Sequence, residues 1–382
     1  MKQITLTVVL VLGVWISGAA VTFSGEGPPT ASPATAADRG DSVYPVGKVI
    51  WDMTRVADRE KTRLEFPDLI RFKGNWYCAF REGEIHGNHP TGRGRVIRSA
   101  DGESWESVAL MEWEGGDVRD PRLSVTAEGA LMLNTSIYFV SRQPRPNGSY
   151  YQLDQRGTPA SDLEMNVARQ SVTWLSFDGA KWSSAYACPS GVNSWRWNVT
   201  WHNGMGYSVA YTGKDGAGTL YRTRDGKSWR VLKPEFFPDG QGNEAAFAFG
   251  ENDTVYCLLR GGRTQAMIGI GKPPYYQDWE WKDAGADWQG DGVARPGDDV
   301  LKGSVGGPKI IRLHDGRLLG AGRIRGRVTL FWIDPERAVF TKFVEVDGTS
   351  YPGVVEHEGM IWVSYGVSDA SEIFLAKIKV PD

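Results

Sequence analysis

The stretch KGNWYCAFRE, residues 73–82, decides the fold, because its pattern recurs five more times along the chain. A turn residue, usually glycine, separates two short apolar runs. The six turn residues are Gly74, Gly129, Gly204, Asp253, Gly316 and Gly359. Two short apolar runs joined by a Gly or Asp turn are typical of an antiparallel hairpin. The sequence therefore predicts six hairpins, with turns spaced 43 to 75 residues apart.

A second motif, Ser/Thr-x-Asp-Gly-x-x-Trp, follows three of these hairpins. Its copies are SADGESW (99–105), SFDGAKW (176–182) and TRDGKSW (223–229). An aspartate before a glycine favours a tight turn, because its carboxylate can accept hydrogen bonds from backbone N–H groups two residues on. The motif adds two strands to a hairpin, which makes about four strands in each unit. The repeats thus predict an all-β fold, a six-bladed β-propeller with four-stranded antiparallel blades.

The N-terminus predicts an exported protein, periplasmic or extracellular. Residues 1–23 place one lysine before an apolar run that ends in small residues, which is typical of a secretory signal. An uncleaved membrane anchor is the alternative, since the run is long enough to span a bilayer. Residues 24–44 are rich in Pro, Ala and Ser and predict an unstructured linker. The propeller domain then covers residues 45–382, with GKVIWDM near its start paired with EIFLAKIKV near its end.

Charge and composition narrow the partners. The 382 residues carry a formal net charge of −3, which argues against a nucleic-acid or anionic-membrane partner. The sequence contains no phosphate loop, zinc motif or paired Cys-x-x-Cys, so we expect no cofactor and no metal. We expect a monomer that contacts a membrane only through an uncleaved anchor. Three cysteines leave at least one free thiol, and we interpret all three as buried packing residues.

Aligning the hairpins on their turn residues brings charged side chains to shared positions. Seven residues after the turn stand Arg81, Arg260 and Arg323, and nine before it stand Glu65, Asp120 and Glu244. Tyr351 stands eight before the last turn. The start of the first strand and the end of the second lie at the same edge of a hairpin, so these side chains should converge at one mouth of the central channel. Arginines there could hold a carboxylate, and a tyrosine beside a carboxylate base could act as a nucleophile.

Loops around this mouth supply further candidates. The loop GEIHGNHPTGRG, residues 83–94, carries Glu84 and His86. An insertion at about 139–168 and the loop 284–302 should form additional walls. A purely structural interpretation stays open, in which the charged residues form Arg–carboxylate pairs that tie the blades together.

On these residues the chain resembles the sialidase (neuraminidase) superfamily, over roughly residues 60–380. The resemblance rests on the Ser/Thr-x-Asp-Gly-x-x-Trp motifs, which look like Asp-box (BNR) repeats, on the blade count and on the export signal. The phrase FREG followed by DVRDPRL (117–123) is similar to a bacterial exo-alpha-sialidase-like subgroup. The resemblance implies a secreted glycosidase that hydrolyses a terminal acidic sugar with retention of configuration.

The resemblance also implies roles for individual residues. Tyr351 in SYPGVV looks like the family's nucleophile, and Glu244 in GNEAAF looks like the base that activates it. Arg260 and Arg323 look like two of the three arginines that hold the substrate carboxylate. The substrate implied is a glycan or glycoconjugate.

The chain departs from the family pattern in two places. Where the first carboxylate-binding arginine is expected, the stretch LEFPDL has Glu65. Arg81 from the neighbouring strand is a hypothetical substitute, and Arg119 is a further candidate for the substrate site. The loop that carries the family's acid/base aspartate lacks an aspartate here. The candidates that remain for this role are Glu84, His86 and Asp120.

Other functions stay open at this point. A hydrolase for another acidic sugar, or for a neutral one, fits the loss of the first arginine. A non-catalytic glycan-binding propeller would keep the arginines and aromatic residues without the acid and the nucleophile. A propeller that only binds partner proteins would have no convergent pocket at all.

Overall fold

The computed structural model describes residues 45, 47–52, 62–146, 148–160, 168–212, 216–240, 242–261, 265–274, 276–284, 301–367 and 371–381. All of them belong to residues 41–382, one of two compact units in the chain. The predicted signal (residues 1–23) and linker (residues 24–44) lie outside the described residues. Residues 285–300 of the predicted wall loop lie outside them as well. In the described part of the chain, no helix has the length and apolar character needed to cross a membrane.

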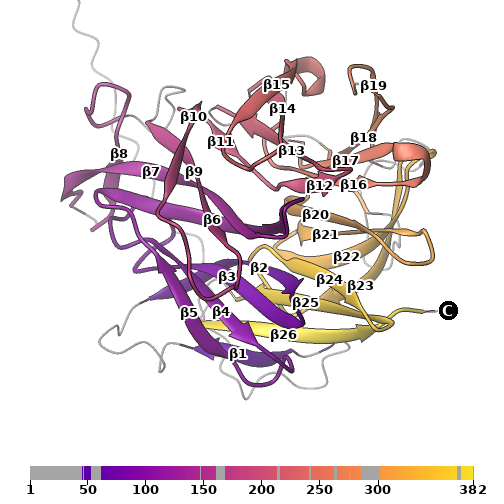
Figure 1. Ribbon diagram of the computed structural model, residues 1–382, viewed down its shortest axis with the longest axis horizontal. Coiled ribbons are helices and arrows are strands. Elements are labelled where there is room, and N and C mark those ends of the chain that lie inside the picture. Colours follow the sequence, from indigo (N-terminus) through magenta and orange to yellow (C-terminus); the bar gives the residue numbers. More distant parts are fainter. Residues whose placement is uncertain are drawn as a thin grey trace, which may run out of the picture. The chain divides into compact units, whose positions relative to one another are not determined.

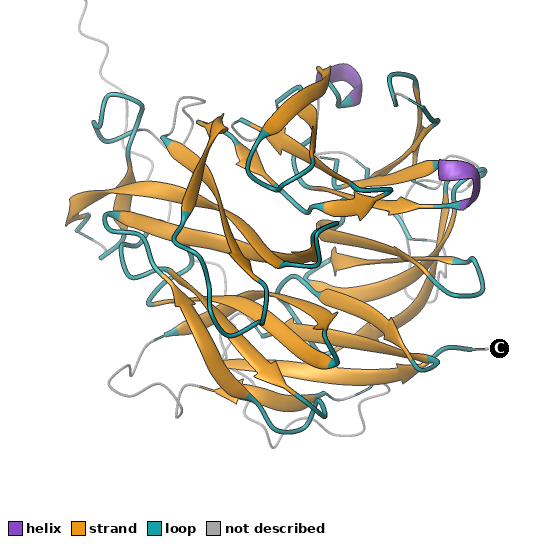
Figure 2. Cartoon of the chain, viewed as in Figure 1, coloured by secondary structure: helices purple, strands orange, loops and turns teal. Residues whose placement is uncertain are grey.

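Six antiparallel sheets account for nearly all of the described secondary structure (Figure 1, Figure 2). Blade one contains β2 (Arg63–Phe72), β3 (Asn75–Gly83), β4 (Arg93–Ser99) and β5 (Glu106–Met111). Blade two contains β6 (Gly116–Val125), β7 (Leu131–Pro144), β9 (Arg169–Ser176) and β10 (Tyr186–Val192), and β8 (Tyr150–Gln152) pairs with β7. Blade three contains β11 (Trp195–Arg196), β12 (Thr200–His202), β13 (Met205–Tyr211), β14 (Thr219–Thr223) and β15 (Trp229–Pro234).

The remaining blades follow the same plan. Blade four contains β16 (Ala245–Phe249), β17 (Val255–Leu259), β18 (Met267–Gly271) and β19 (Trp279–Asp283). Blade five contains β20 (Gly306–Arg312), β21 (Leu318–Ile324), β22 (Arg327–Asp334) and β23 (Val339–Val346). Blade six contains β24 (Gly353–His357), β25 (Met360–Gly366), β26 (Glu372–Lys379) and β1 (Lys48–Asp52). The described helices are two short 3₁₀ turns, η3 (Pro238–Gly240) and η4 (Glu251–Asp253).

The first strands of the blades form a closed ring. In succession, β2 contacts β6, β6 contacts β12, β12 contacts β16, β16 contacts β20, β20 contacts β24, and β24 contacts β2. Blade six is completed from both ends of the domain, because β1 pairs antiparallel with β26, with Val49 opposite Phe374. The six-bladed β-propeller predicted from the hairpins is therefore confirmed, and so is the predicted pairing of the first and last strands.

All six predicted turns join the first two long strands of a blade, and each turn residue has a positive φ. The angles are 79° at Gly74, 76° at Gly129, 75° at Gly204, 59° at Asp253, 92° at Gly316 and 71° at Gly359. Glycine adopts this left-handed region without a steric penalty, and aspartate tolerates it better than most residues. Because the turn requires a residue that tolerates a positive φ, the turn positions could be recognised in the sequence.

The three Asp-Gly turns join the third and fourth strands of blades one, two and three and share one set of hydrogen bonds. In blade one, Asp101 Oδ1 accepts hydrogen bonds from the backbone N–H groups of Glu103 at 2.8 Å and Ser104 at 3.0 Å. These bonds lower the pKa of Asp101 to about 2. Asp178 and Asp225 accept equivalent backbone bonds in their own turns. Their assignment to the Asp-box family stays a prediction.

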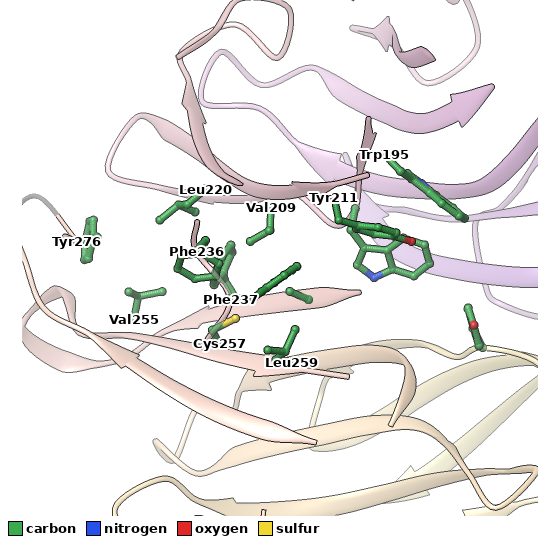
Figure 3. Packing of buried hydrophobic residues seen from close by; sticks show 14 of the residues in the cluster. Trp195, Val209, Tyr211, Leu220, Phe236, Phe237, Val255, Cys257, Leu259 and Tyr276 are labelled. Carbon is green, nitrogen blue, oxygen red and sulfur yellow. The ribbon is translucent and has the colours of Figure 1, made fainter. Parts of the chain in front are cut away.

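Apolar clusters fill the spaces between neighbouring blades. Figure 3 shows the cluster in which Tyr211 and Leu220 of blade three approach Cys257 and Leu259 of blade four. Full burial of a side chain of this size stabilises the fold by roughly 1.5–3 kcal/mol. All three cysteines are free and buried, as the packing interpretation predicted.

Three of the first strands contain a β-bulge next to a proline. On β2, β6 and β20 the pairing register shifts at Phe66-Pro67, Asp120-Pro121 and Gly307-Pro308. The residue before each proline has a positive φ, of 58°, 27° and 60° respectively. A bulge bends its strand and changes the direction of the side chains beside it. Phe66 and Gly307 at two of these bulges, and Arg122 just after the third, lie beside Tyr351, so the bulges position the site described next.

Candidate active site

Three polar side chains from blades four and six meet in a buried cluster. The Tyr351 hydroxyl donates a hydrogen bond to Glu244 Oε1 at 2.9 Å. Arg260 Nη1 donates to the same carboxylate oxygen at 2.7 Å and to the Tyr351 hydroxyl at 3.0 Å. Tyr351 is 6 % exposed and Glu244 is 4 % exposed. The structure thus brings the predicted nucleophile, its predicted base and one predicted substrate-binding arginine into direct contact.

Close backbone packing holds this cluster in place. The second carboxylate oxygen of Glu244 accepts a hydrogen bond from the backbone N–H of Gly307 at 2.7 Å. A Cβ atom at Gly307 would lie 2.1 Å from Tyr351 Cγ, so this bulge position has no room for a side chain. The carboxylate therefore has its acceptor sites directed at the tyrosine, the arginine and the bulge.

The electrostatics of the cluster favour a protonated tyrosine. Burial raises the pKa of Tyr351 above its ordinary value, and the negative charge of Glu244 raises it further, while Arg260 and Arg323 oppose this rise. The charge of Glu244 in turn raises the pKa of Arg260. The resting state is then a neutral phenol that donates a hydrogen bond to Glu244 and accepts one from Arg260, so a proton acceptor lies next to the hydroxyl, as an activated tyrosine needs.

Aromatic and cationic groups surround the Tyr351 ring. The Phe66 ring centroid lies 5.0 Å from that of Tyr351, and the Trp197 centroid lies 6.1 Å away. The guanidinium carbon of Arg323 lies 5.1 Å from the centre of the tyrosine ring, and that of Arg122 lies 5.9 Å from it. The tyrosine is therefore fixed between apolar faces and two positive charges.

Arg122 is the most unusual member of this group. It is 1 % exposed, and its guanidinium carbon lies 4.5 Å from the centre of the Trp197 ring. None of its three guanidinium nitrogens has a hydrogen-bond partner among the described residues. The equivalent positions after the bulges of blades one and five pair with each other, because Lys309 Nζ lies 2.7 Å from Asp68 Oδ1. Arg122 is left as a buried cation without a hydrogen-bonded acid.

The arginine of blade one has a different environment from that of blade four. Arg81 is fully buried and donates to Asp117 through Nε at 2.8 Å and Nη2 at 3.0 Å. Its Nη1 donates to Glu65 at 3.4 Å and to the carbonyl oxygen of Ile85 at 2.9 Å. The guanidinium is thus occupied by groups of the protein and does not contact Tyr351 in the interactions described.

Glu65 forms a pair with a histidine of the mouth loop. His86 Nδ1 lies 2.9 Å from Glu65 Oε1, and the His86 side chain is 55 % exposed. Burial raises the pKa of Glu65, but the hydrogen bond and charge of His86, together with Arg81, outweigh it and lower the pKa overall. The His86 ring lies against Phe66, with centroids 5.5 Å apart, and Phe66 is the ring that also packs on Tyr351. His86 is therefore an accessible group at the edge of the tyrosine cluster.

Asp120 is buried at the bulge of blade two. It is 2 % exposed, its Oδ1 has no hydrogen-bond partner among the described residues, and Arg119 Nε lies 3.6 Å away. Burial raises the pKa of Asp120, against the opposing charges of Arg119 and Arg122. The Arg119 guanidinium lies over the Phe66 ring at 5.5 Å. Both predicted residues therefore lie beside the cluster, one with a raised carboxyl pKa and one over its aromatic edge.

Glu84 lies further out on the mouth loop. Its side chain is 52 % exposed, and His89 Nε2 lies 3.7 Å from Glu84 Oε2. The His89 ring packs edge-on against Tyr150, with centroids 4.8 Å apart. The described part of the insertion that follows β7 within blade two therefore reaches the mouth loop. Among the described residues, no group of three His, Cys, Asp or Glu side chains is arranged to hold a metal ion.

Sequence reasoning missed Arg122, Lys309 and Asp117. A signal for the first two was present in the tetrapeptides FPDL (66–69), DPRL (120–123), GPKI (307–310) and YPGV (351–354). The residue before the proline marks the bulge in three of these blades, and Tyr351 has the same place in the fourth. The residue after the proline then lies on the first strand of its blade, and it is charged in three of these four blades. No comparable pattern marks Asp117.

Comparison with solved structures supports the fold. The chain is similar to a protein of unknown function from Dyadobacter fermentans (TM-score 0.65, 18 % identity, covering 89 % of this chain and 98 % of that one). It is also similar to a sialidase from Streptococcus pneumoniae (TM-score 0.60, 11 % identity, 87 % and 70 % covered) and to an alpha-L-arabinanase from Penicillium chrysogenum (TM-score 0.56, 12 % identity, 88 % and 98 % covered).

These similarities concern the fold alone, because the identities are low. No protein-family model matches the sequence. No curated protein matches it either. The chain therefore has a sialidase-like β-propeller fold, which it shares with two kinds of glycoside hydrolase.

Proposed function

We propose that the protein is an exported, retaining glycoside hydrolase that uses Tyr351 as its nucleophile and Glu244 as the base. The observation that carries this proposal is the buried hydrogen bond from the Tyr351 hydroxyl to Glu244 Oε1, at 2.9 Å, with Arg260 bonded to both. A tyrosine needs an adjacent acceptor for its proton before it can attack an anomeric carbon. Similarity to glycosidase propellers agrees with this chemistry at the level of the fold.

In the first step, the phenol oxygen of Tyr351 attacks the anomeric carbon while its proton passes to Glu244. The bond from the anomeric carbon to the leaving oxygen breaks, and an acid at the mouth protonates that oxygen. His86 is accessible for this role, and Glu65 holds it at 2.9 Å. Asp120, with its raised carboxyl pKa, is the other candidate close to the cluster.

In the second step, water attacks the same carbon from the side that the leaving group vacated. The mouth residue that gave its proton now accepts one from the water. The tyrosyl–carbon bond breaks, and Glu244 returns the proton to the phenol oxygen. Two inversions at one carbon give overall retention.

The cations around the tyrosine favour an acidic sugar. Arg260 has a 26 % exposed side chain, and the guanidinium groups of Arg122 and Arg323 both lie near the Tyr351 ring. Arginine matches a carboxylate with a planar set of donors. Arg81 already has four bonds to protein groups, so the acid-binding role falls mainly on the other three.

The test is hydrolysis of a panel of sialosides, other ulosonic acid glycosides and neutral glycosides, including arabinosides. On the substrate that wild type hydrolyses, Tyr351→Phe should lose at least about 100-fold in kcat. Tyr276→Phe is the matched control, because the Tyr276 hydroxyl donates a hydrogen bond to the Asp253 carbonyl, in the turn at the far end of blade four. Near wild-type turnover by Tyr351→Phe would show that the nucleophile lies elsewhere.

A non-catalytic glycan-binding propeller is the second candidate. It is favoured by one observation: Glu84, the carboxylic acid predicted on the mouth loop, has a 52 % exposed side chain beside His89 and no contact with the Tyr351 cluster in the interactions described. This function predicts saturable binding of one member of the panel without any product. The hydrolase proposal predicts product from the ligand that binds.

A further inference from the structure

A groove with three arginines lies on blade three, away from the candidate active site. It has a cavity volume of about 540 Å³, and Arg222, Arg224 and Arg230 line it together with Asp225 and Ser228. Thr223 pairs with Gly206, next to the hairpin turn at Gly204, so the groove lies at the turn end of the blade. Glu244 and Arg260 lie at the opposite end of their hairpin from its turn. We call this cavity the blade-three groove.

The three arginines of the blade-three groove form no ion pair with an acid among the described residues. Arg222 and Arg230 stand directly opposite each other on β14 and β15. Like charges in directly opposed cross-strand positions destabilise a sheet. Among the described residues, none of the three guanidinium groups of the groove has a hydrogen bond or an ion pair. The only carboxylate in the lining, Asp225, directs Oδ1 at backbone N–H groups of its own turn.

The same two positions in blade one are complementary. Arg98 and Glu106 stand opposite each other on β4 and β5, just before Ser99 and just after Trp105 of the Asp-Gly turn, and they form an ion pair. In blade two the equivalent residues, Leu175 and Ser183, carry no charge. The fold therefore accepts an ion pair or neutral residues at these positions, and nothing in the turn itself requires two arginines in blade three.

We propose that the blade-three groove is a second binding site, for an oligosaccharide that carries carboxylates. Three guanidinium groups in one cavity would supply planar pairs of donors for two or more sugar carboxylates. The side chains of Asp225 and Ser228 would accept hydrogen bonds from sugar hydroxyls between the acidic groups. The volume lies within the range of small-ligand sites, about 300–1,000 Å³. This site does not depend on the hydrolase activity proposed for the mouth.

Other anions fit the groove less well. Nucleic-acid sites that lack sequence specificity combine basic residues with aromatic side chains on which bases stack, and no aromatic residue lines the groove. The formal net charge of −3 also repels a long polyanion over distance. A carboxylated glycan has a lower charge density and offers hydroxyl groups, which matches a lining of mixed charge.

Calorimetric titration of the full chain with tetragalacturonic acid tests the proposal. Wild type should bind it, and maltotetraose, which has no carboxylate, should not bind. Arg230→Glu should weaken binding at least 10-fold, because it removes a cation and places an acid opposite Arg222, as in blade one. The variant should fold, since it replaces a repulsive pair with an attractive one. Lys379→Glu, at an exposed position on β26, makes the same change in net charge and should bind like wild type.

Four outcomes would overturn the proposal. They are no binding by wild type, equal affinity for maltotetraose, undiminished binding by Arg230→Glu, and equal weakening by Lys379→Glu. Binding lost in Arg323→Ala but kept in Arg230→Glu would assign the oligosaccharide to the mouth instead. Equally tight binding of oligothymidylate would show a general polyanion site and contradict the glycan assignment. Whether or not the candidate active site hydrolyses a glycoside, the interpretation of each of these binding results stays the same.

Discussion

Blades one and four carry the same charged pair at the same place, and the two pairs have different uses. Glu65 and Arg81 stand opposite each other on β2 and β3, and Glu244 and Arg260 stand at the matching ends of β16 and β17. In blade four the arginine and the carboxylate share the hydroxyl of Tyr351. In blade one the arginine is fully buried and bonded to other groups of the protein.

The third partner explains the difference. Asp117 reaches Arg81 from the neighbouring blade with both carboxylate oxygens and accepts two of the four hydrogen bonds that Arg81 donates. No acid of a neighbouring blade pairs with Arg260 in the described part of the chain, and its side chain stays 26 % exposed. A repeated residue in a repeat fold therefore does not have a repeated function. The neighbouring blade decides whether the pair is structural or available for chemistry.

The largest expected effect comes from removing the carboxylate charge in each pair. Glu244→Gln should lower kcat about 1,000-fold or more, since Tyr351 would lose the group that accepts its proton. Glu65→Gln should lower kcat far less, because Glu65 acts on the reaction only through His86. The Glu65→Gln variant should instead show a changed pH profile of kcat/KM. Steady-state kinetics on the substrate found with the panel measures both. Equal losses in the two variants would mean that the two pairs are equivalent after all.

The second effect concerns the free energy of unfolding, which should fall more when the arginine of blade one is replaced than when that of blade four is replaced. Arg81→Met leaves the buried carboxylate of Asp117 without the arginine that donates two hydrogen bonds to it, so it should lower the free energy of unfolding by about 3–5 kcal/mol. Arg260→Met should cost about 1–2 kcal/mol, because Glu244 keeps its bonds to Tyr351 and to the Gly307 N–H. Urea unfolding at neutral pH measures both values. A larger loss in Arg260→Met would reverse the assignment of structural and chemical roles.

The fold could be predicted because its signals are local. Each hairpin turn needs a residue that tolerates a positive φ, so Gly74 and its five equivalents appear in the sequence at the turn itself. The Asp-Gly turns depend on a side chain that bonds to backbone groups two and three residues on, as at Asp101. Counting from such fixed points placed the ends of the strands correctly at one mouth.

The site could be predicted only in part, because bulges and neighbouring blades determine the rest. Counting back from a turn assumes regular pairing, but the bulge at Asp120-Pro121 adds a residue and directs Arg122 toward Tyr351. The pairing of Arg81 with Asp117 joins two blades at a separation of 36 residues, for which the sequence has no periodic signal. The charge pattern of one blade therefore cannot show which of its groups the next blade has already neutralised.

The smallest effect is the dependence of stability on pH, and it tests the blade-one pair by itself. The pKa of Glu65 is lowered overall, because His86 and Arg81 outweigh the effect of burial. A carboxyl whose pKa is lower in the folded state stabilises the fold above its unfolded pKa, and this stabilisation is lost as the pH falls through the folded value.

Wild type should therefore lose stability as the pH falls from about 4.5. His86→Ala removes the largest lowering influence on the pKa of Glu65, so the loss of stability on acidification should become smaller. Urea unfolding of wild type, Glu65→Gln and His86→Ala between about pH 6 and pH 3 measures the three slopes. A slope in His86→Ala as steep as that of wild type would mean that His86 does not stabilise the charged form of Glu65. The proposed role of this pair as an accessible acid at the mouth would then be wrong.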